Sequence, residues 1–129
     1  MTKIVLDASA LLALLAAEPG AEMVADTIPG ANIGAVNLEE VVGKLALRGM
    51  PEAEIRNAVS ALGLSVHPFT EQLAVESGLL RPTTDHYGLS LGDRAALALA
   101  RHLGLPTYTS DSAWQDVGPA IDVTVRLIR

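Results

Sequence analysis

The sequence contains no cysteine and few aromatic residues, and both absences narrow what the chain can be. Without cysteine there is no disulfide, no thiolate zinc site and no thiol nucleophile. With only 3% aromatic residues, the core must be built mainly from small and aliphatic side chains, which are abundant because 50% of the residues are hydrophobic. A length of 129 residues fits one domain of ordinary size, so we expect a single domain over residues 1–129.

Positive charge is also scarce. Nine Lys and Arg residues stand against 15 Asp and Glu residues, and the formal net charge is −6. Proteins that coat nucleic acids are normally basic, so this charge argues against that class. An acidic chain can still act on a nucleic acid where bound metal ions invert the local field. The histidines, His67, His86 and His102, lack the spacing of metal ligands.

No stretch of the chain approaches the roughly 20 apolar residues that a membrane span needs. Residues 3–17 loosely resemble a signal peptide, with a short apolar run after Lys3. Asp7 interrupts that run, and no small-x-small cleavage site follows it. We therefore expect a cytoplasmic protein that does not bind membranes.

Strand-like and helix-like segments alternate along the chain. Short apolar runs, typical of buried strands, are separated by longer segments with helical periodicity. Predicted strands cover residues 3–7, 31–36, 64–69, 105–111 and 121–128, and predicted helices cover 8–18, 21–28, 37–49, 51–63, 70–81, 91–104 and 112–118. This alternation predicts an α/β domain with a mostly parallel central sheet.

Four carboxylates fall at corresponding ends of these predicted elements. Asp7 and Asp111 end the first and fourth strands, while Glu40 and Asp93 are expected in the first turns of helices. In a parallel sheet, the carboxyl ends of the strands and the N-termini of the following helices share one edge. The sequence therefore predicts that all four acids lie at that edge.

Each acid taken singly has a structural alternative. Ser90 and Asp93 have the spacing of a capping box, and Asn37 and Glu40 have the analogous Asn-x-x-Glu form. Acids in such positions satisfy backbone donors at a helix start and complement the helix dipole. Four clustered carboxylates repel one another, however, and must take up protons or share a cation. Oxygen ligands without cysteine suit Mg²⁺ or Mn²⁺, ions that activate water for attack on phosphodiesters.

Four blocks of the sequence carry a resemblance to a known family. They are VLDASALLALL (5–15), AVNLEEVVGKL (35–45), LSLGDRAALALARHLGLP (89–106) and TSDSAW (109–114). In order and spacing they resemble the motifs of PIN-domain proteins, and in particular those of VapC-like toxins from bacterial toxin–antitoxin pairs. The blocks span nearly the whole chain, and the L-G-D-R-A block together with T-x-D-x-x-W is the specific part.

The resemblance implies a three-layer α/β/α sandwich in which the first and fourth strands are neighbours. It also implies an endoribonuclease that depends on Mg²⁺ or Mn²⁺ and hydrolyses RNA phosphodiester bonds with metal-activated water. Carried over by position, the metal-binding and catalytic acids are Asp7, Glu40, Asp93 and Asp111. Asp116 and Ser9 are candidates for an outer shell around the metal.

The resemblance implies partners as well: a small cognate antitoxin that covers the acidic groove, and a second copy of the chain in a homodimer. Two alternative hypotheses for the function of the chain remain. One is a catalytically silent PIN-like binding module. The other is a receiver-type phosphoacceptor domain, which needs paired acids after the first strand and a lysine at a late strand end. Here Asp7 is followed by Ala8 and Ser9, and the lysines are Lys3 and Lys44.

Two further residues allow alternative interpretations. Arg94 could contact phosphate or an acid of the site, or it could form a structural ion pair. Trp114 could stack on a base, but its place in an apolar turn favours a role in anchoring the short helix.

Overall fold

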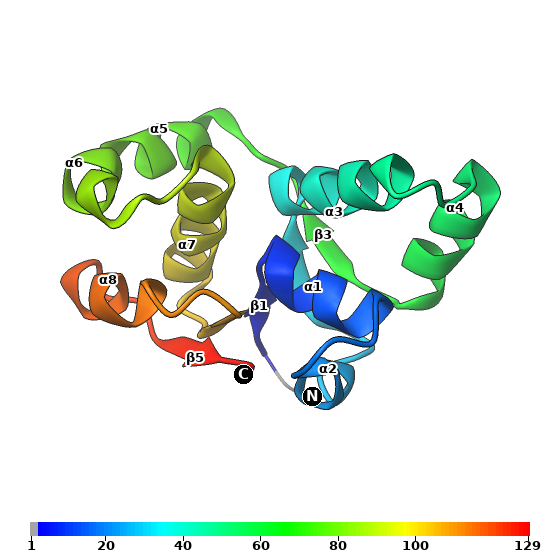
Figure 1. Ribbon diagram of the computed structural model, residues 1–129. Helices are drawn as coiled ribbons and strands as arrows, with labels where there is room; N and C mark the ends of the chain where they lie inside the picture. Colours follow the sequence, from blue (N-terminus) through cyan, green and yellow to red (C-terminus); the bar gives the residue numbers. More distant parts are fainter. Residues whose placement is uncertain (1–2) are drawn as a thin grey trace.

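The computed structural model describes residues 3–129, and its centre is a five-stranded parallel sheet (Figure 1). The strand order is β3-β2-β1-β4-β5, and every pairing is parallel. The strands are β1 (Val5–Leu6), β2 (Asn32–Gly34), β3 (Ser65–His67), β4 (Thr107–Thr109) and β5 (Val125–Leu127). The expected parallel sheet and the expected pairing of the first and fourth strands are both confirmed.

β1 lies at the centre of the sheet, where the order of the strands reverses. From β1 the chain moves outward to β2 and β3, and it then returns to form β4 and β5 on the other side of β1. Val5 accordingly pairs with Asn32 of β2 and with Thr107 of β4. The carboxyl ends of β1 and β4 therefore flank a topological switch point, the place where open α/β sheets bind ligands.

Helices connect the strands. Within residues 3–129 they are α1 (Ala8–Leu15), α2 (Ala21–Ala25), α3 (Ala35–Leu47), α4 (Glu52–Ala61), α5 (Glu71–Leu79), α6 (Arg81–Thr84), the 3₁₀ helix η1 (Asp85–Tyr87), α7 (Leu91–Leu103) and α8 (Trp114–Ala120). In Figure 1, α1 to α4 lie on one side of the molecule and α5 to α8 on the other. No helix in this part of the chain has both the length and the apolar character needed to cross a bilayer.

Two apolar cores, one on each face of the sheet, give the molecule three layers. Successive side chains of a strand point to opposite faces. Ile4 and Leu6 pack with residues of α1 to α4, whereas Val5 between them packs with residues of α5, α7 and α8. The predicted α/β/α sandwich is confirmed. The almost completely buried stretch 94–100 of α7 fills much of the second core.

Some helix boundaries differ from the sequence-based expectation. Residues 35–36, expected to end the second strand, already belong to α3, because Gly34 is its N-cap. Pro51, expected at the first helical position, is the N-cap of α4. The helix expected over residues 70–81 is α5, which ends slightly earlier, at Leu79. The short helix α6 that follows is not predicted from the sequence; it contains Pro82 in its first turn, where a missing N–H costs no hydrogen bond.

Candidate active site between β1 and β4

Asp7 is the most firmly held of the candidate acids. It directly follows β1 and is the N-cap of α1, and its side chain is only 4% exposed. Oδ1 accepts hydrogen bonds from Ser9 Oγ (2.7 Å) and Ala10 N (2.8 Å), and Oδ2 accepts one from Thr109 Oγ1 (2.6 Å). Burial raises the pKa of Asp7 to about 6 although these hydrogen bonds lower it. The carboxylate is thus rigidly oriented but costly to keep charged.

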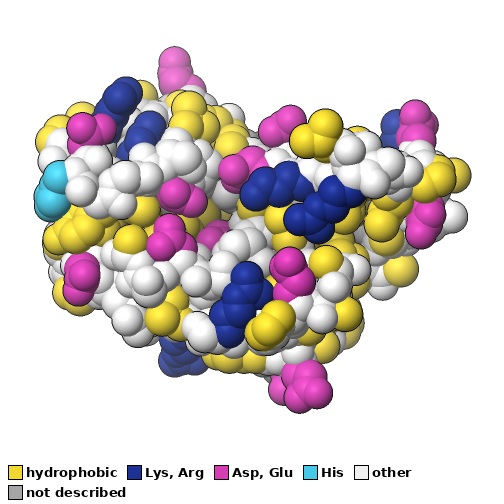
Figure 2. All heavy atoms as spheres, in the orientation of Figure 1, with side chains coloured by type: hydrophobic (Ala, Val, Ile, Leu, Met, Phe, Trp, Pro, Cys, Tyr) yellow, Lys and Arg dark blue, Asp and Glu magenta, His cyan; other side chains and the backbone are white. Residues whose placement is uncertain are grey.

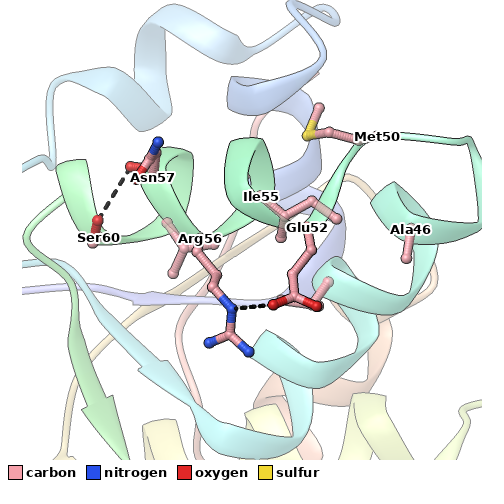
Figure 3. A pocket seen from close by; sticks show the side chains of 9 residues that line it. Ala46, Met50, Glu52, Ile55, Arg56, Asn57 and Ser60 are labelled. Atoms are coloured by element: carbon pink, nitrogen blue, oxygen red, sulfur yellow. Dashed lines mark hydrogen bonds and ion pairs between the residues drawn. The ribbon is translucent and has the colours of Figure 1, made fainter.

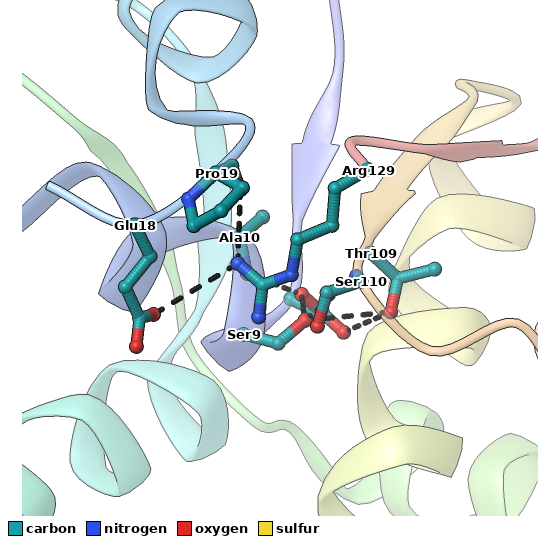
Figure 4. A network of polar contacts seen from close by, with 8 residues as sticks. Ser9, Ala10, Glu18, Pro19, Thr109, Ser110 and Arg129 are labelled. Atoms are coloured by element: carbon teal, nitrogen blue, oxygen red, sulfur yellow. Dashed lines mark hydrogen bonds and ion pairs between the residues drawn. The ribbon is translucent and has the colours of Figure 1, made fainter.

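Hydroxyl groups join the end of β4 to this carboxylate (Figure 4). Thr109 is fully buried, and its hydroxyl donates to Asp7 and accepts from the backbone N–H of Asp111 (3.1 Å). Ser9 Oγ, which donates to Asp7, accepts from Ser110 N (2.9 Å). The hydroxyl of Ser9, a candidate for the outer shell of the metal, therefore fixes Asp7 and binds the backbone that follows β4.

Asp111 lies just beyond β4 and is exposed. Its Oδ1 accepts a hydrogen bond from Ala113 N (3.0 Å), which closes a turn leading into α8. A single threonine hydroxyl thus links the Asp7 carboxylate to the backbone of Asp111. Asp116 lies exposed in the first turn of α8.

Glu40 comes from α3, but not from its first turn as expected. Because α3 begins at Ala35, Asn37 is its third residue rather than its N-cap, and Glu40 falls in the second turn. Glu40 Oε1 accepts a hydrogen bond from Asn37 Nδ2 (2.9 Å). Burial of the half-buried carboxyl raises the pKa of Glu40, the bond from Asn37 lowers it, and the charge of Asp93 raises it.

Asp93 has the capping role that its spacing from Ser90 indicates. With Ser90 it forms a complete capping box at the start of α7: Ser90 N donates to Asp93 Oδ2 (2.9 Å), and Asp93 N donates to Ser90 Oγ (3.2 Å). Its charge also raises the pKa of both Asp7 and Glu40. Asp93 therefore lies near enough to affect the ionisation of both carboxyls, although burial is the larger cause for each and Asp93 contributes least to the shift of Asp7.

The site can be tested for its fit to a divalent cation. Within residues 3–129, no three or more His, Asp or Glu side chains are arranged so that they could hold a metal ion together. The donors present are carboxylate oxygens, and Figure 2 shows Asp and Glu side chains near the middle of this face. Mg²⁺ is commonly bound through one or two carboxylates, with water and substrate phosphate completing its octahedron. By donor chemistry, the residues fit a hard cation of this kind.

Arg94 and Trp114 both prove to be internal. Arg94 is 9% exposed, and its Nη1 donates to the carbonyl of Leu89 (3.0 Å), so the structural interpretation holds, though with a backbone partner in place of an acid. Trp114 is fully buried in the core beneath α8. Its expected anchoring role is confirmed, and base stacking by this side chain is ruled out in this conformation.

A separate cavity of about 720 Å³ lies between α3 and α4 (Figure 3). It is lined mainly by apolar side chains, with a polar rim that includes the exposed ion pair between Arg56 and Glu52. None of the four candidate acids lines it. The acidic site and this cavity are therefore different features of the surface.

Two residues of the site were missed by the sequence-based reasoning. Thr109 stands in the T-x-D part of the fourth block, but nothing in the sequence predicts that its hydroxyl donates to Asp7. Asn37 was read as a helix cap, whereas its amide bonds both Glu40 and the Gly92 carbonyl of α7. The available signals were position alone: Thr109 ends the strand expected beside the first one, and Asn37 lies near the start of a helix at the same edge of the sheet.

Comparison with known proteins agrees with this architecture. A model of the PIN domain family matches residues 4–119. The sequence has no match among curated proteins. The fold is similar to DNA-bound VapBC from Salmonella typhimurium, with a TM-score of 0.76 at 16% identity over 100% of both chains.

Two other solved structures are similar. VapC20 of Mycobacterium tuberculosis, described as a sarcin-ricin loop cleaving toxin, has a TM-score of 0.73 at 21% identity, over 89% of this chain and 95% of that one. VapBC-1 from nontypeable Haemophilus influenzae has a TM-score of 0.72 at 18% identity, over 98% of both chains. These likenesses show a shared fold. Because the family model spans most of the sequence, the chain belongs to the PIN domain family.

Proposed function

We propose that this protein is a metal-dependent endoribonuclease that serves as the toxin of a toxin–antitoxin pair. The observation that carries the proposal is geometric: Asp7 ends β1 beside β4 at the switch point of the sheet, and Asn37 ties Glu40 to the start of α7, the helix that carries Asp93. Burial raises the pKa of both Asp7 and Glu40, and the charge of Asp93 raises it further, so a cation at this site would favour the charged carboxylates. Such an arrangement is typical of functional sites.

Asp7, Glu40, Asp93 and Asp111 would hold Mg²⁺ or Mn²⁺, with Ser9 and Asp116 farther out. When bound, the ion would supply activation of a water molecule and stabilisation of charge at the phosphate. The protein fixes the positions of the carboxylates. Asp7 is fixed by three donors, while the exposed Asp111 and partly exposed Asp93 face solvent, where a nucleic acid can approach.

RNA is the proposed substrate class, and an antitoxin the proposed partner. VapC20, which shares the fold, is described as cleaving the sarcin-ricin loop. VapBC from Salmonella typhimurium and FitAB are described as complexes bound to DNA. By analogy, a small cognate antitoxin would cover the acidic groove of this chain, and the chain would act as a homodimer in the cytoplasm.

A catalytically silent binding module is the second candidate. It is favoured by one observation: within residues 3–129, no three or more of the acids stand in an arrangement that could hold a metal ion together. Such a module would still bind an antitoxin and would leave RNA intact. Measurement of cleavage separates the two candidates.

The test compares two acid-to-amide variants. Asp93→Asn removes one candidate metal ligand and its charge, while the amide oxygen can still accept the Ser90 N–H and preserve the helix start. Asp85→Asn is the control, because Asp85 is an exposed acid in η1 whose ion-pair partner within residues 3–129 is the nearby Arg81. Cellular RNA is incubated with each purified protein in Mg²⁺ or Mn²⁺, with EDTA as a blank, and the cut ends are mapped.

We expect the wild type and Asp85→Asn to cleave with 5′-phosphate and 3′-hydroxyl ends. Asp93→Asn is expected to be at least about 100-fold slower, with a free energy of unfolding within about 1 kcal/mol of the wild-type value. Cleavage by Asp93→Asn at the wild-type rate would contradict the site assignment. Absence of cleavage by the wild type, together with antitoxin binding, would favour the silent module.

A further inference from the structure

Asn37 is a buried polar residue at the junction of two helices. It is 2% exposed and lies on the face of α3 that also carries the buried Val41 and Leu45. Its Nδ2 donates to Glu40 Oε1 (2.9 Å) within α3 and to the carbonyl of Gly92 (2.9 Å) in the first turn of α7. One amide group therefore joins Glu40 to the helix that carries Asp93.

The chemistry of the two partners fixes the orientation of this amide. A carboxylate and a carbonyl only accept hydrogen bonds, so the NH₂ group must face both of them. The amide oxygen then points away, and it is buried with no hydrogen-bond partner among the described residues. An aliphatic residue would avoid that unpaired oxygen. Asn37 is therefore poorly explained as a packing residue and better explained by what its NH₂ group holds.

Gly92 forms the other side of the slot that holds Glu40. A Cβ atom at residue 92 would stand 2.6 Å from Glu40 Oε2 and still closer to Oε1. Residue 92 is buried in α7, so the carboxylate occupies the space that any larger side chain would fill. The bare backbone of Gly92 thus admits the Glu40 carboxylate and, through its carbonyl, anchors the amide that orients it.

We infer that Asn37 is a positioning residue: with Gly92, it holds the Glu40 carboxylate in the orientation in which Glu40 binds the divalent ion. This inference rests on the proposed function, since it assigns Glu40 a metal. Residues that orient a metal ligand without touching the metal typically change metal affinity by 10–100-fold when they are removed. A residue that only ties α3 to α7 would instead change stability and leave metal affinity unchanged.

The test is a double-mutant cycle read out by metal binding rather than by cleavage. Wild type, Asn37→Ala, Glu40→Ala and the double variant are titrated with Mn²⁺, and bound ion is counted by electron paramagnetic resonance or calorimetry. If Asn37 acts through Glu40, Asn37→Ala weakens Mn²⁺ binding about 10–100-fold in the wild-type background and has almost no further effect in the Glu40→Ala background. Equal losses in the two backgrounds would overturn the inference.

Two further variants distinguish a specific effect on Mn²⁺ affinity from a general loss of stability. Gly92→Ala leaves Asn37 intact but places a methyl group against Glu40, so it should also weaken Mn²⁺ binding. Thr84→Val removes an equally buried polar group, whose hydroxyl donates to the Leu80 carbonyl (3.0 Å) in α6, and should reduce stability without altering Mn²⁺ affinity. Weakening by Thr84→Val as large as by Asn37→Ala would identify a merely structural effect and overturn the inference.

The outcomes also separate this inference from the proposed function. If wild type binds Mn²⁺ and Asn37→Ala binds it equally well, the positioning role is wrong and the proposed function stands. If wild type binds no Mn²⁺ at millimolar concentration, the metal-dependent function is overturned, and the positioning role is overturned with it.

Discussion

Thr109 Oγ1 donates a 2.6 Å hydrogen bond to Asp7 Oδ2, across 102 positions of the sequence. Both side chains are buried, at 0% and 4% exposure. A hydrogen bond to a charged acceptor in such surroundings is stronger than one to a neutral carbonyl. The parallel pairing of β1 with β4 thus delivers a specific donor to the central acid of the site.

The strength of this bond can be measured against a matched neighbour on the same strand. Thr107 is equally buried, and its hydroxyl donates to the neutral carbonyl of Val5 (2.9 Å). At pH 8, Thr109→Val should lower the free energy of unfolding by roughly 1.5–3 kcal/mol and Thr107→Val by about 0.5–1.5 kcal/mol. Urea denaturation provides both values. Equal losses would show that Asp7 is not charged in the folded protein at that pH.

The pKa of Asp7 predicts how stability depends on pH in the absence of divalent ions. The pKa rises from 3.8 to about 6 on folding, so the folded protein binds more protons than the unfolded chain between these values. Stability is therefore highest below pH 4 for this group and falls as pH rises through 6. With about 1.4 kcal/mol per pKa unit, the loss amounts to about 3 kcal/mol.

Asp7→Asn should remove most of this fall, because an amide does not ionise. Denaturation midpoints in EDTA between pH 4.5 and 8 would show a flatter profile for Asp7→Asn, with a residual slope of the same sign from Glu40, whose pKa is also raised. Asp85→Asn should follow the wild-type profile because its carboxylate is exposed before and after unfolding. A wild-type slope retained by Asp7→Asn would assign the effect to another group.

Divalent ions should stabilise the folded protein above pH 7, where they replace protons as the partners of the acids. At an ion concentration 100 times the dissociation constant, mass action adds about 2.7 kcal/mol to the free energy of unfolding. Thermal unfolding with Mg²⁺ or Mn²⁺ and with EDTA measures this gain. Asp7→Asn and Asp93→Asn should lose this stabilisation. If both variants gained as much stability from the ion as the wild type does, the ion would bind elsewhere.

Trp114, the one tryptophan of the sequence, provides a spectroscopic check on the fold around α8. Because the ring is fully buried, its emission should be blue-shifted and poorly quenched by acrylamide. Addition of a single-stranded RNA oligonucleotide should leave both properties unchanged. Quenching by RNA would show that α8 moves and exposes the ring, contrary to its anchoring role.

The order of elements and the sheet edge carrying the acids could be predicted from the sequence because they depend on strong, regular signals. Apolar runs of strand length alternate with helical periodicity, and parallel strands place their carboxyl ends together. The capping box of Ser90 and Asp93 was likewise visible as a local pattern and is present. Such local patterns can be recognised in the sequence because the N–H groups at a helix start need hydrogen-bond acceptors wherever the helix packs.

The finer geometry of the site could not be predicted from local patterns. The Asn-x-x-Glu spacing suggested a cap at Asn37, but Gly34 begins the helix earlier, and Asn37 bonds a carbonyl 55 positions away instead. The sequence left open whether Arg94 contacts phosphate or has a structural role, and only tertiary packing decides this by burying it against the Leu89 carbonyl. Bonds between distant segments follow from how the layers pack, which no short motif encodes.

The bond between Thr109 and Asp7 also bears on how the protein is made. Asp7 leaves the ribosome about a hundred residues before its donor, and Asp93 and Asp111 likewise lie in the last third of the chain. A nascent chain that has not yet added β4 beside β1 lacks both the donor and the far side of the acidic edge. As a ribonuclease, the protein would therefore complete its active site only when its own translation is nearly finished. Until then it could not cleave the messenger or the ribosome that produce it.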